Sequence, residues 1–431
     1  MKTARILLVV SAIGLATASF VAAQARPEDR YWGQWRGPLA TGVSRTATPP
    51  TEWSETKNIR WKVPIPGLGS GTPVVWGDLL FVLTAVPSTP VAARAPAGAP
   101  HKFMVMAIDR KTGKTVWERL AKEEATHESA HPDNGTFASS SAVTDGQHVI
   151  ANFESRGLFA YDMKGTPVWQ KDLGDKAMRN TFGEGTTPAL HGRYLVHVWD
   201  HQGQSFIVAL DKNTGAELWR KNREEIDTWA TPLIVPVDGR PQVIVPAMNK
   251  VRSYDLETGE IVWETAGLTM NPIPSPVFED GLVFLTSGFR GNSLKAVRLA
   301  GAKGDITGTP NVVWTFDRDT PYVPSPLVYD GFLYILKTNN GVLTVFDTKT
   351  GKPHYALQRL EATPNVFASP VGAAGRVYIT GREGSTIVLK NGGAFETIAV
   401  NKLDDGFDAS PALVDSEIYM RGTKFLYCIA Q

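Results

Sequence analysis

A Ser/Thr-Pro-apolar cluster recurs along this 431-residue chain and constrains its fold more than any other feature. Seven copies contain the proline, and Ser141-Ala142-Val143 is an eighth copy without it. The seven are Thr72-Pro73-Val74, Thr187-Pro188-Ala189, Thr231-Pro232-Leu233, Ser275-Pro276-Val277, Ser325-Pro326-Leu327, Ser369-Pro370-Val371 and Ser410-Pro411-Ala412. From position 142 onward, successive copies lie 41–50 residues apart. A repeat of this length indicates one supersecondary unit per copy, so that the units stack in an array or close into a ring.

The residues after each cluster are typical of short antiparallel strands. Asp145-Gly146, Asp238-Gly239, Asp280-Gly281 and Asp330-Gly331 are pairs that accept the positive φ of tight hairpin turns. A proline at the first position of a strand costs no ladder hydrogen bond. We therefore expect each unit to begin with a β-hairpin.

A second marker, Asp-x-x-Thr-Gly-x-x-x-Trp, lies farther along the units. It spans 109–117, 211–219 and 255–263; the copy at 347–355 ends in Tyr, and the copy at 162–169 is one residue shorter. The Asp and Gly suit a tight turn, and the Trp is expected to pack between neighbouring sheets. The six tryptophans at repeat spacing are therefore predicted to be core residues: Trp61, Trp117, Trp169, Trp219, Trp263 and Trp314.

Together the markers predict an all-β, eight-bladed β-propeller with four antiparallel strands in each blade. A four-strand unit of about 45 residues cannot bury both faces alone, but eight units around an axis can. The last unit ends with a third strand, Phe425 to Ile429, and residues 58–63 supply the missing outer strand. The N-terminal strand is thus predicted to complete the last blade and close the ring. Seven blades or an open solenoid are the alternatives, and a solenoid would not need this split unit.

The first 25 residues have the pattern of a secretory signal peptide. Lys2 and Arg5 precede an apolar run from Ile6 to Ala18, and small residues at 21–25 offer cleavage after Ala23 or Ala25. The run is short for a membrane anchor. We predict a signal peptide at 1–25, an N-terminal extension at 26–56 and the propeller at 57–431. No cysteine that could carry a lipid lies beside the cleavage site, so a periplasmic or secreted protein without a transmembrane segment is expected.

Composition excludes several classes of protein. The formal charge of +1 and the 42% hydrophobic content exclude a disordered polyelectrolyte and give no basis for nucleic-acid binding. Cys428 is the only cysteine, so no disulfide can form within the chain. Its neighbours alternate like a strand, which favours a packing role for this thiol.

The repeats also carry a resemblance to a known family. The form Ala-x-Asp-x-x-Thr-Gly-x-x-x-Trp, intact at 107–117 and 209–219, resembles the tryptophan-docking repeat of pyrroloquinoline quinone (PQQ) propellers. The segment Trp32-Gly33-Gln34-Trp35-Arg36-Gly37-Pro38 is similar to the lead-in of exported bacterial PQQ-like repeat proteins. That superfamily includes quinoprotein dehydrogenases and the non-catalytic outer-membrane assembly factor BamB, and the shared fold does not choose between them.

The resemblance implies two function classes. For a PQQ-dependent dehydrogenase, the resemblance implies adjacent cysteines against the quinone, a calcium held by Glu, Asn and Asp, and an Asp that acts as the base. A single cysteine excludes the vicinal disulfide, and no calcium triad can be matched. We therefore favour a non-catalytic binding or scaffold protein of the cell envelope, predict no cofactor, and keep PQQ-dependent dehydrogenation as the alternative. A sugar-active propeller would need a facing pair of carboxylates among Glu184, Asp404, Asp405 and Asp408.

Two groups of histidines invite a metal site. His127-Glu128-Ser129-Ala130-His131 has the H-E-x-x-H form of zinc proteases, but Pro132 and the turn residues after it oppose the required helix. A polar loop is the favoured interpretation, with a loop metal site formed by His127, His131 and Asp133 left open. His191, His197 and His201 are more simply explained by packing and surface positions.

A ligand site is predicted at the funnel face, where the connections between blades and the loops between second and third strands meet. Six of these loops carry a basic residue, which would focus positive potential into the funnel, and Trp229 and Asn292 would add contacts. The expected ligand is an envelope protein, a peptide or a small anion; solvated ion pairs are the simpler alternative for the charges. The basic residues are Arg156, Lys250, Arg290, Lys337, Arg382 and Arg421.

Overall fold

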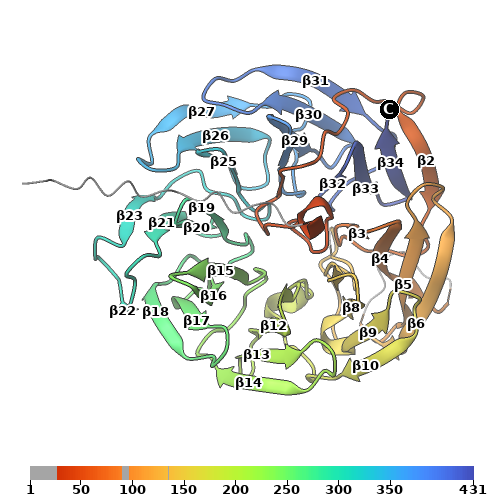
Figure 1. Cartoon of the computed structure of the whole chain (residues 1–431), viewed down its shortest axis with the longest axis horizontal. Helices are drawn as coiled ribbons and strands as arrows, with labels where there is room; N and C mark the ends of the chain where they lie inside the picture. The colour runs from red at the N-terminus through yellow and green to blue at the C-terminus, as the bar shows by residue number, and fades with distance from the viewer. Residues whose placement is uncertain (1–26, 90–96, 134) are drawn as a thin grey trace, which may run out of the picture.

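The computed structural model describes residues 27–89, 97–133 and 135–431 and has eight sheets arranged in a ring (Figure 1). It confirms the all-β, eight-bladed propeller. The only helical elements in the described chain are the 3-10 turns η1 (Pro27–Arg30), η2 (Glu154–Arg156) and η3 (Arg179–Thr181). The predicted signal peptide lies outside the described residues.

Each blade consists of four antiparallel strands that run in sequence order from the axis outward, except where the N-terminal strand completes the last blade. Blades 1 to 4 are formed by β3 (Val74–Trp76), β4 (Leu79–Pro87), β5 (Pro100–Asp109), β6 (Thr115–Ala125); β7 (Val143–Thr144), β8 (His148–Asn152), β9 (Leu158–Asp162), β10 (Pro167–Lys171); β11 (Ala189–His191), β12 (Tyr194–Trp199), β13 (Phe206–Asp211), β14 (Glu217–Asn222); and β15 (Leu233–Val237), β16 (Arg240–Val245), β17 (Lys250–Asp255), β18 (Ile261–Ala266).

Blades 5 to 8 repeat this order. They are formed by β19 (Val277–Glu279), β20 (Leu282–Ser287), β21 (Ser293–Arg298), β23 (Val312–Phe316); β24 (Leu327–Tyr329), β25 (Phe332–Leu336), β26 (Val342–Asp347), β27 (Pro353–Arg359); β28 (Val371–Ala373), β29 (Arg376–Thr380), β30 (Ser385–Lys390), β31 (Thr397–Lys402); and β32 (Ala412–Val414), β33 (Glu417–Arg421), β34 (Phe425–Ala430), β2 (Ile59–Pro64). Two short strands add to blades in parallel: β1 (Val43–Ser44) beside β28, and β22 (Gly304–Asp305) beside β18.

The recurrent Ser/Thr residues link neighbouring blades around the axis. In seven of the eight, the backbone N–H donates to the hydroxyl of the corresponding residue in the next blade, for example Thr72 to Ser141 at 2.9 Å and Ser141 to Thr187 at 3.0 Å. The series continues through Thr231, Ser275, Ser325, Ser369 and Ser410. At the end of the series, Thr72 Oγ1 is buried and has no hydrogen-bond partner among the described residues. The sequence repeat is therefore a chain of hydrogen bonds that fixes the spacing of the innermost strands.

Two isosteric substitutions test this linkage. Thr187→Val removes the hydroxyl that accepts the Ser141 N–H, and an unsatisfied buried donor costs about 1–3 kcal/mol of the free energy of unfolding. Thr72→Val removes a buried hydroxyl that has no partner, so it should leave that free energy unchanged or raise it. Denaturant unfolding of both variants gives the comparison, and equal losses would contradict the assigned role of the hydroxyls.

The docking tryptophans join the outer parts of the blades. Trp117 donates its indole N–H to the Met163 carbonyl of the next blade, and its ring covers Gly165, where a Cβ would lie 2.7 Å from the ring. Gly165 has φ +80°, so this position needs glycine both for the turn and for the close approach of the ring. Trp61, Trp169, Trp219 and Trp314 make the same two contacts with the following blade. Trp263 instead donates to Gln242 of its own blade.

The N-terminal strand closes the ring as the split repeat predicts. β2 pairs antiparallel with β34, and Trp61 from this strand docks on Gly113 and the Arg110 carbonyl of blade 1. The buried Arg110 guanidinium also binds Glu417 of blade 8 at 2.6 Å. Cys428 lies opposite Trp61 in β34, fully buried, and burial raises the pKa of its thiol to about 12.

The extension that precedes β2 enters the centre of the ring. Trp32 is fully buried and pairs with Val75 of β3, and β1 runs parallel to β28 farther along the same segment. Figure 1 shows this N-terminal segment in red over the axis of the propeller. The Trp-Gly-Gln-Trp-Arg-Gly-Pro stretch, noted in the sequence only for its resemblance, therefore fills part of the axial channel.

Truncation separates the contributions of ring closure and channel filling. A chain beginning at Gly67 loses β2 and Trp61, exposing the edge of β34, and should aggregate or melt far below the protein beginning at residue 26. A chain beginning at Thr51 keeps β2 but lacks the channel segment, and we expect an intermediate melting temperature. Thermal unfolding gives all three values, and a Gly67 chain as stable as the longest chain would refute closure by β2.

Candidate functional site

The axial channel contains two cavities, which the N-terminal segment separates. We call the larger one, of about 850 Å3, the axial chamber, and the smaller one, of about 370 Å3, the funnel cavity. Trp35 and Thr187 line both. The chamber includes residues of the turns between first and second strands, such as His191 and Asp280, whereas the funnel cavity includes connections between blades, such as Glu184 and Trp229. The two cavities thus belong to opposite faces of the propeller.

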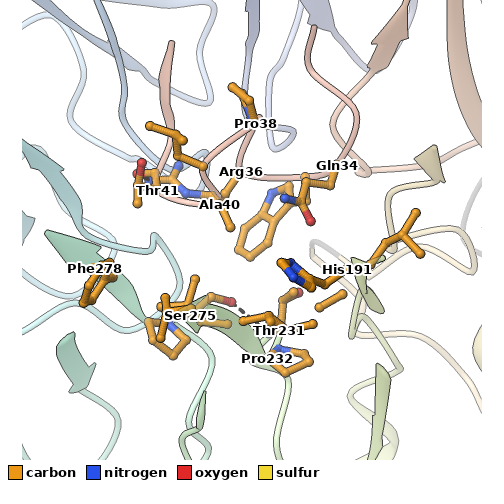
Figure 2. Close-up of a pocket in the computed structure, with 18 of the residues that line it drawn as sticks. Gln34, Arg36, Pro38, Ala40, Thr41, His191, Thr231, Pro232, Ser275 and Phe278 are labelled. Atoms are coloured by element: carbon orange, nitrogen blue, oxygen red, sulfur yellow. Dashed lines mark hydrogen bonds between the residues drawn. The ribbon is translucent and has the colours of Figure 1, made fainter. Parts of the chain in front are cut away.

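The axial chamber is mostly apolar. Figure 2 shows Arg36 and Pro38 of the N-terminal segment across the chamber from Pro232, Ser275 and Phe278 of the inner strands and their approaches. Aliphatic side chains of blades 3 and 4 extend the apolar wall. They include Leu190, Leu233, Ile234 and Val235.

Arg36 holds the N-terminal segment in place at the chamber wall. Its guanidinium donates to the carbonyl oxygens of Pro370, Pro326 and Thr41 at 2.9, 2.9 and 3.0 Å. The side chain is buried, and this burial lowers the pKa of Arg36 to about 9. The arginine therefore ties the segment to the inner ends of blades 6 and 7 through backbone acceptors.

The funnel cavity combines aromatic and ionisable side chains. Its aromatic residues are Trp35, Phe182, Trp229, Tyr322 and Phe367, and its ionisable residues are His131, Asp133, Glu184, Arg382 and Asp408. The indole N–H of Trp229 donates to the Gly183 carbonyl at 2.8 Å, which fixes the ring at the cavity wall. A concave site of this size with a few polar groups among aromatic walls is typical of ligand sites.

The structure brings two of the eight sequence-predicted ligand residues to this cavity, namely Trp229 and Arg382. Arg382 binds both oxygens of Asp408, at 2.6 and 3.1 Å. Asn292 accepts hydrogen bonds from Thr320, and Arg290 lies over Phe289 on the rim of blade 5.

The other predicted basic residues are held by partners outside the cavity. Arg156 binds Asp175 at 2.8 Å, and Lys337 binds Asp319 at the same distance. Lys250 lies between Glu264 and Asp305 on the outer strands of blade 4, and these carboxylates raise its pKa. Arg421 is buried and donates to the Leu83 carbonyl, and burial lowers its pKa to about 10. The predicted basic residues therefore lie at separate positions, each beside its own partner, and do not form one ring of positive charge around the funnel.

A buried ionic cluster lies behind the funnel cavity. Lys176 is 1% exposed, its ammonium lies 2.6 Å from a Glu154 carboxylate oxygen, and it faces the ring of Trp199. Burial opposes the charge of Glu154, but Lys176 and the nearby His197 outweigh it and lower the pKa of Glu154 to about 2. Glu184 accepts hydrogen bonds from Ser155, yet burial and the charge of Glu154 raise its pKa. Together with Glu184, this cluster holds two carboxyl groups and the single ammonium of Lys176.

Sequence reasoning missed most of this arrangement. Phe182, Tyr322 and Phe367 are isolated aromatic residues in connecting loops, with no repeat that marks them. Their position before or beside the inner strands is the only signal that could have selected them. Lys176 lies in a polar connection and gives no sign of burial in the sequence.

The structure also shows where the candidate catalytic and metal residues lie. Glu184 and Asp408 both line the funnel cavity, whereas Asp405, in the connection between β31 and β32, accepts hydrogen bonds from Thr423 and Lys424 in the turn between β33 and β34. His127 contacts Arg156 and the Lys176 carbonyl, and His131 packs on Phe182. Within the described ranges, no group of three or more His, Cys, Asp or Glu residues is placed to hold a metal ion.

PQQ does not fit the residues of this channel. The quinone carries three carboxyl groups, but the only Lys or Arg among the described residues lining the funnel cavity is Arg382, which Asp408 already neutralises. Three carboxyl groups of the protein line the same cavity. Cys428 is buried in the last blade, so no thiol pair can face a quinone there.

The family follows from a comparison over nearly the whole propeller. A family model described as outer membrane protein assembly factor BamB matches residues 50–206 and 203–429. The chain belongs to this family. The BamB family is thus the branch of PQQ-like propellers that both halves of the chain match.

Individual relatives agree with this assignment. The outer membrane protein assembly factor BamB of Yersinia pestis is 24% identical over 303 residues, 68% of this chain and 61% of the relative. The BamB of Francisella salina is 32% identical over 96 residues, 22% of this chain and 17% of the relative. The chain matches less than two thirds of the length of these curated relatives.

Solved structures show the same fold. BamB from Moraxella catarrhalis superimposes with a TM-score of 0.56 at 13% identity, covering 85% of this chain and 95% of that one. The quinohemoprotein alcohol dehydrogenase ADHIIG from Pseudomonas putida HK5 gives 0.57 at 12% identity, covering 93% and 80%. Because a BamB and a dehydrogenase match equally well, this likeness shows the fold alone.

Replacement of Lys176 tests the buried cluster. Lys176→Met leaves the Glu154 carboxylate buried without its main partner, which should cost about 3–5 kcal/mol in the free energy of unfolding. Because the pKa of Glu154 is lowered in the folded protein, the pair stabilises above about pH 4.5, and this contribution is lost as the pH falls toward 2. The variant should therefore lose much of the acid dependence of stability.

Lys221→Met is the matched control. Lys221 pairs with the exposed Glu260 on the outer strands, and an exposed pair contributes about 0–1 kcal/mol. Denaturant titrations at pH 7 and at about pH 3, between the unfolded and folded pKa values of Glu154, give both differences. A Lys176 variant that is no less stable than the Lys221 variant would contradict the role of the buried pair.

Proposed function

We propose that this chain is an exported, non-catalytic binding propeller of the cell envelope that holds a partner protein of outer-membrane assembly on its funnel face. The observation that carries the proposal is the match of the BamB family model to both halves of the propeller. The relatives that this chain resembles in sequence are named outer membrane protein assembly factors.

Export and location form part of the same proposal. The basic start, the apolar run and the small residues of the first 25 positions support a cleaved signal peptide, and hence a periplasmic or secreted protein. None of the helices in the described part of the chain is long and apolar enough to cross a membrane. Fractionation of cells with and without residues 1–25 tests this location.

The funnel face is the proposed binding surface because it combines a concavity with loops from many blades. Loops set on a rigid scaffold vary freely and are the usual carriers of binding residues. Trp229 and Arg382 are the sequence-predicted ligand residues that line this concavity, so we assign them to the site. The remaining predicted residues, which include Arg290 and Asn292 of blade 5, would lie in the surrounding rim.

Site-specific photocrosslinking in cells tests the choice of face. Asp133 is exposed at the funnel cavity, and Asp280 is exposed in a turn on the opposite face. A photoreactive residue at position 133 should crosslink to a protein of the outer-membrane assembly machinery, whereas one at position 280 should not. Crosslinking from position 280 alone would move the binding surface to the other face.

The alternative function, PQQ-dependent dehydrogenation, has its own test. Purified protein with added PQQ and calcium is assayed for dye-linked oxidation of alcohols. We expect no turnover, because the chain has a single cysteine and the only Lys or Arg among the described residues of the funnel cavity, Arg382, is paired with Asp408. Turnover that depends on PQQ would overturn the non-catalytic assignment.

A further inference from the structure

One wall of the funnel cavity binds a positively charged group of the protein itself, the guanidinium of Arg382. The guanidinium carbon of Arg382 lies 4.3 Å from the ring centroid of Phe367, and its nitrogens bind both oxygens of Asp408. An aromatic face and a carboxylate therefore share one cation on the blade 7 side of the cavity. Such cation–π contacts strengthen where water is excluded.

An aromatic face and a carboxylate also occur together across the channel, and on that side no Lys or Arg of the described residues lines the cavity. Glu184 and Phe182 lie in the connection between blades 2 and 3, and Trp229 precedes blade 4, so these residues approach from the side opposite blade 7. Among the described lining residues, Arg382 is the only Lys or Arg. Its further hydrogen bond, 3.1 Å to the Asp133 carbonyl, places the Asp133 loop at the cavity too.

The ionisable groups around the wall formed by Glu184, Phe182 and Trp229 carry a net negative charge. Behind Glu184, the single ammonium of Lys176 is bound by Glu154 at 2.6 Å. His127 lies 3.8 Å from a Glu184 oxygen, but its Nε2 also lies 2.7 Å from the Lys176 carbonyl oxygen. Burial and Glu154 raise the pKa of Glu184, as expected of a carboxylate without a full counter-charge. A cation in the cavity would supply that charge.

We propose that the funnel cavity binds a small organic cation, an amine or a quaternary ammonium, between the carboxylate of Glu184 and the rings of Trp229 and Phe182. A cavity of about 370 Å3 lies within the usual size range of small-molecule sites. Asp133 adds a second negative charge at the rim. This inference goes beyond the proposed partner protein and does not depend on it.

The proposed ligand is positively charged, whereas the sequence led us to expect a negatively charged one. The basic residues at the funnel face suggested an anion, but those that pair with carboxylates, such as Arg156, Lys337 and Arg382, are already neutralised. The charge that remains at the cavity wall is that of Glu184 and Asp133. An anionic ligand is therefore the competing outcome of the experiment.

Calorimetric titration of the purified protein provides the test, with choline, spermidine and citrate as probes at low ionic strength. We expect saturable binding of choline and spermidine that weakens with salt, and no comparable binding of citrate. Glu184→Gln should weaken binding of the cations at least tenfold, and Trp229→Leu should weaken it several-fold. Glu217→Gln, in an exposed pair with Arg220 on the outer edge of blade 3, is the matched control and should bind like the parent.

Thermal unfolding of each variant shows whether it is folded. If Glu184→Gln does not fold, Asp133→Asn at the exposed rim takes its place, with an expected loss of several-fold in spermidine affinity. Citrate that binds more tightly than either cation would overturn the proposal. So would cation binding that the folded Glu184 and Trp229 variants retain unchanged. Neither result alters the crosslinking pattern that tests the partner protein.

Discussion

Each blade of this propeller has two apolar faces, and only its neighbours can cover them. In five of the eight blades, the contact that covers the outer part of one face is a tryptophan that lies over a glycine of the next blade, while its indole N–H satisfies a carbonyl there. Nearer the axis, the Ser/Thr hydroxyls accept N–H groups from the preceding blade. Both contacts point in one direction around the ring, so a blade that makes them depends on the next one to cover its face.

Closure of the ring follows from the same dependence. The last blade lacks an outer strand of its own, and β2 supplies both that strand and the tryptophan that docks on blade 1. Arg110 of blade 1 then binds Glu417 of blade 8 across the seam. Segments far apart in the sequence thereby close the ring between blades 8 and 1.

The channel left at the centre is partly filled by the protein itself. Arg36 anchors the N-terminal segment to backbone carbonyls of blades 6 and 7, and Trp35 separates the axial chamber from the funnel cavity. The funnel cavity has aromatic walls and ionisable groups, and a buried ionic cluster lies behind them. This arrangement gives the BamB-like propeller a recessed site in addition to the loop surface that a partner protein would cover.

The sequence by itself determined the repeat, the blade count and the split blade, because these depend on local turn chemistry and on a spacing that recurs. The positive φ expected of the Asp-Gly turns is confirmed at Asp238, Asp280 and Asp330, whereas at the remaining pair only Gly146 adopts it. The tertiary structure alone decided the site. Whether Arg382 or Lys250 faces the channel depends on how far each loop reaches and which acid lies beside it. The burial of Lys176, the position of Trp35 and the placement of Glu184 and Trp229 at one cavity depend on segments from different blades, and no periodicity along the chain encodes such an arrangement.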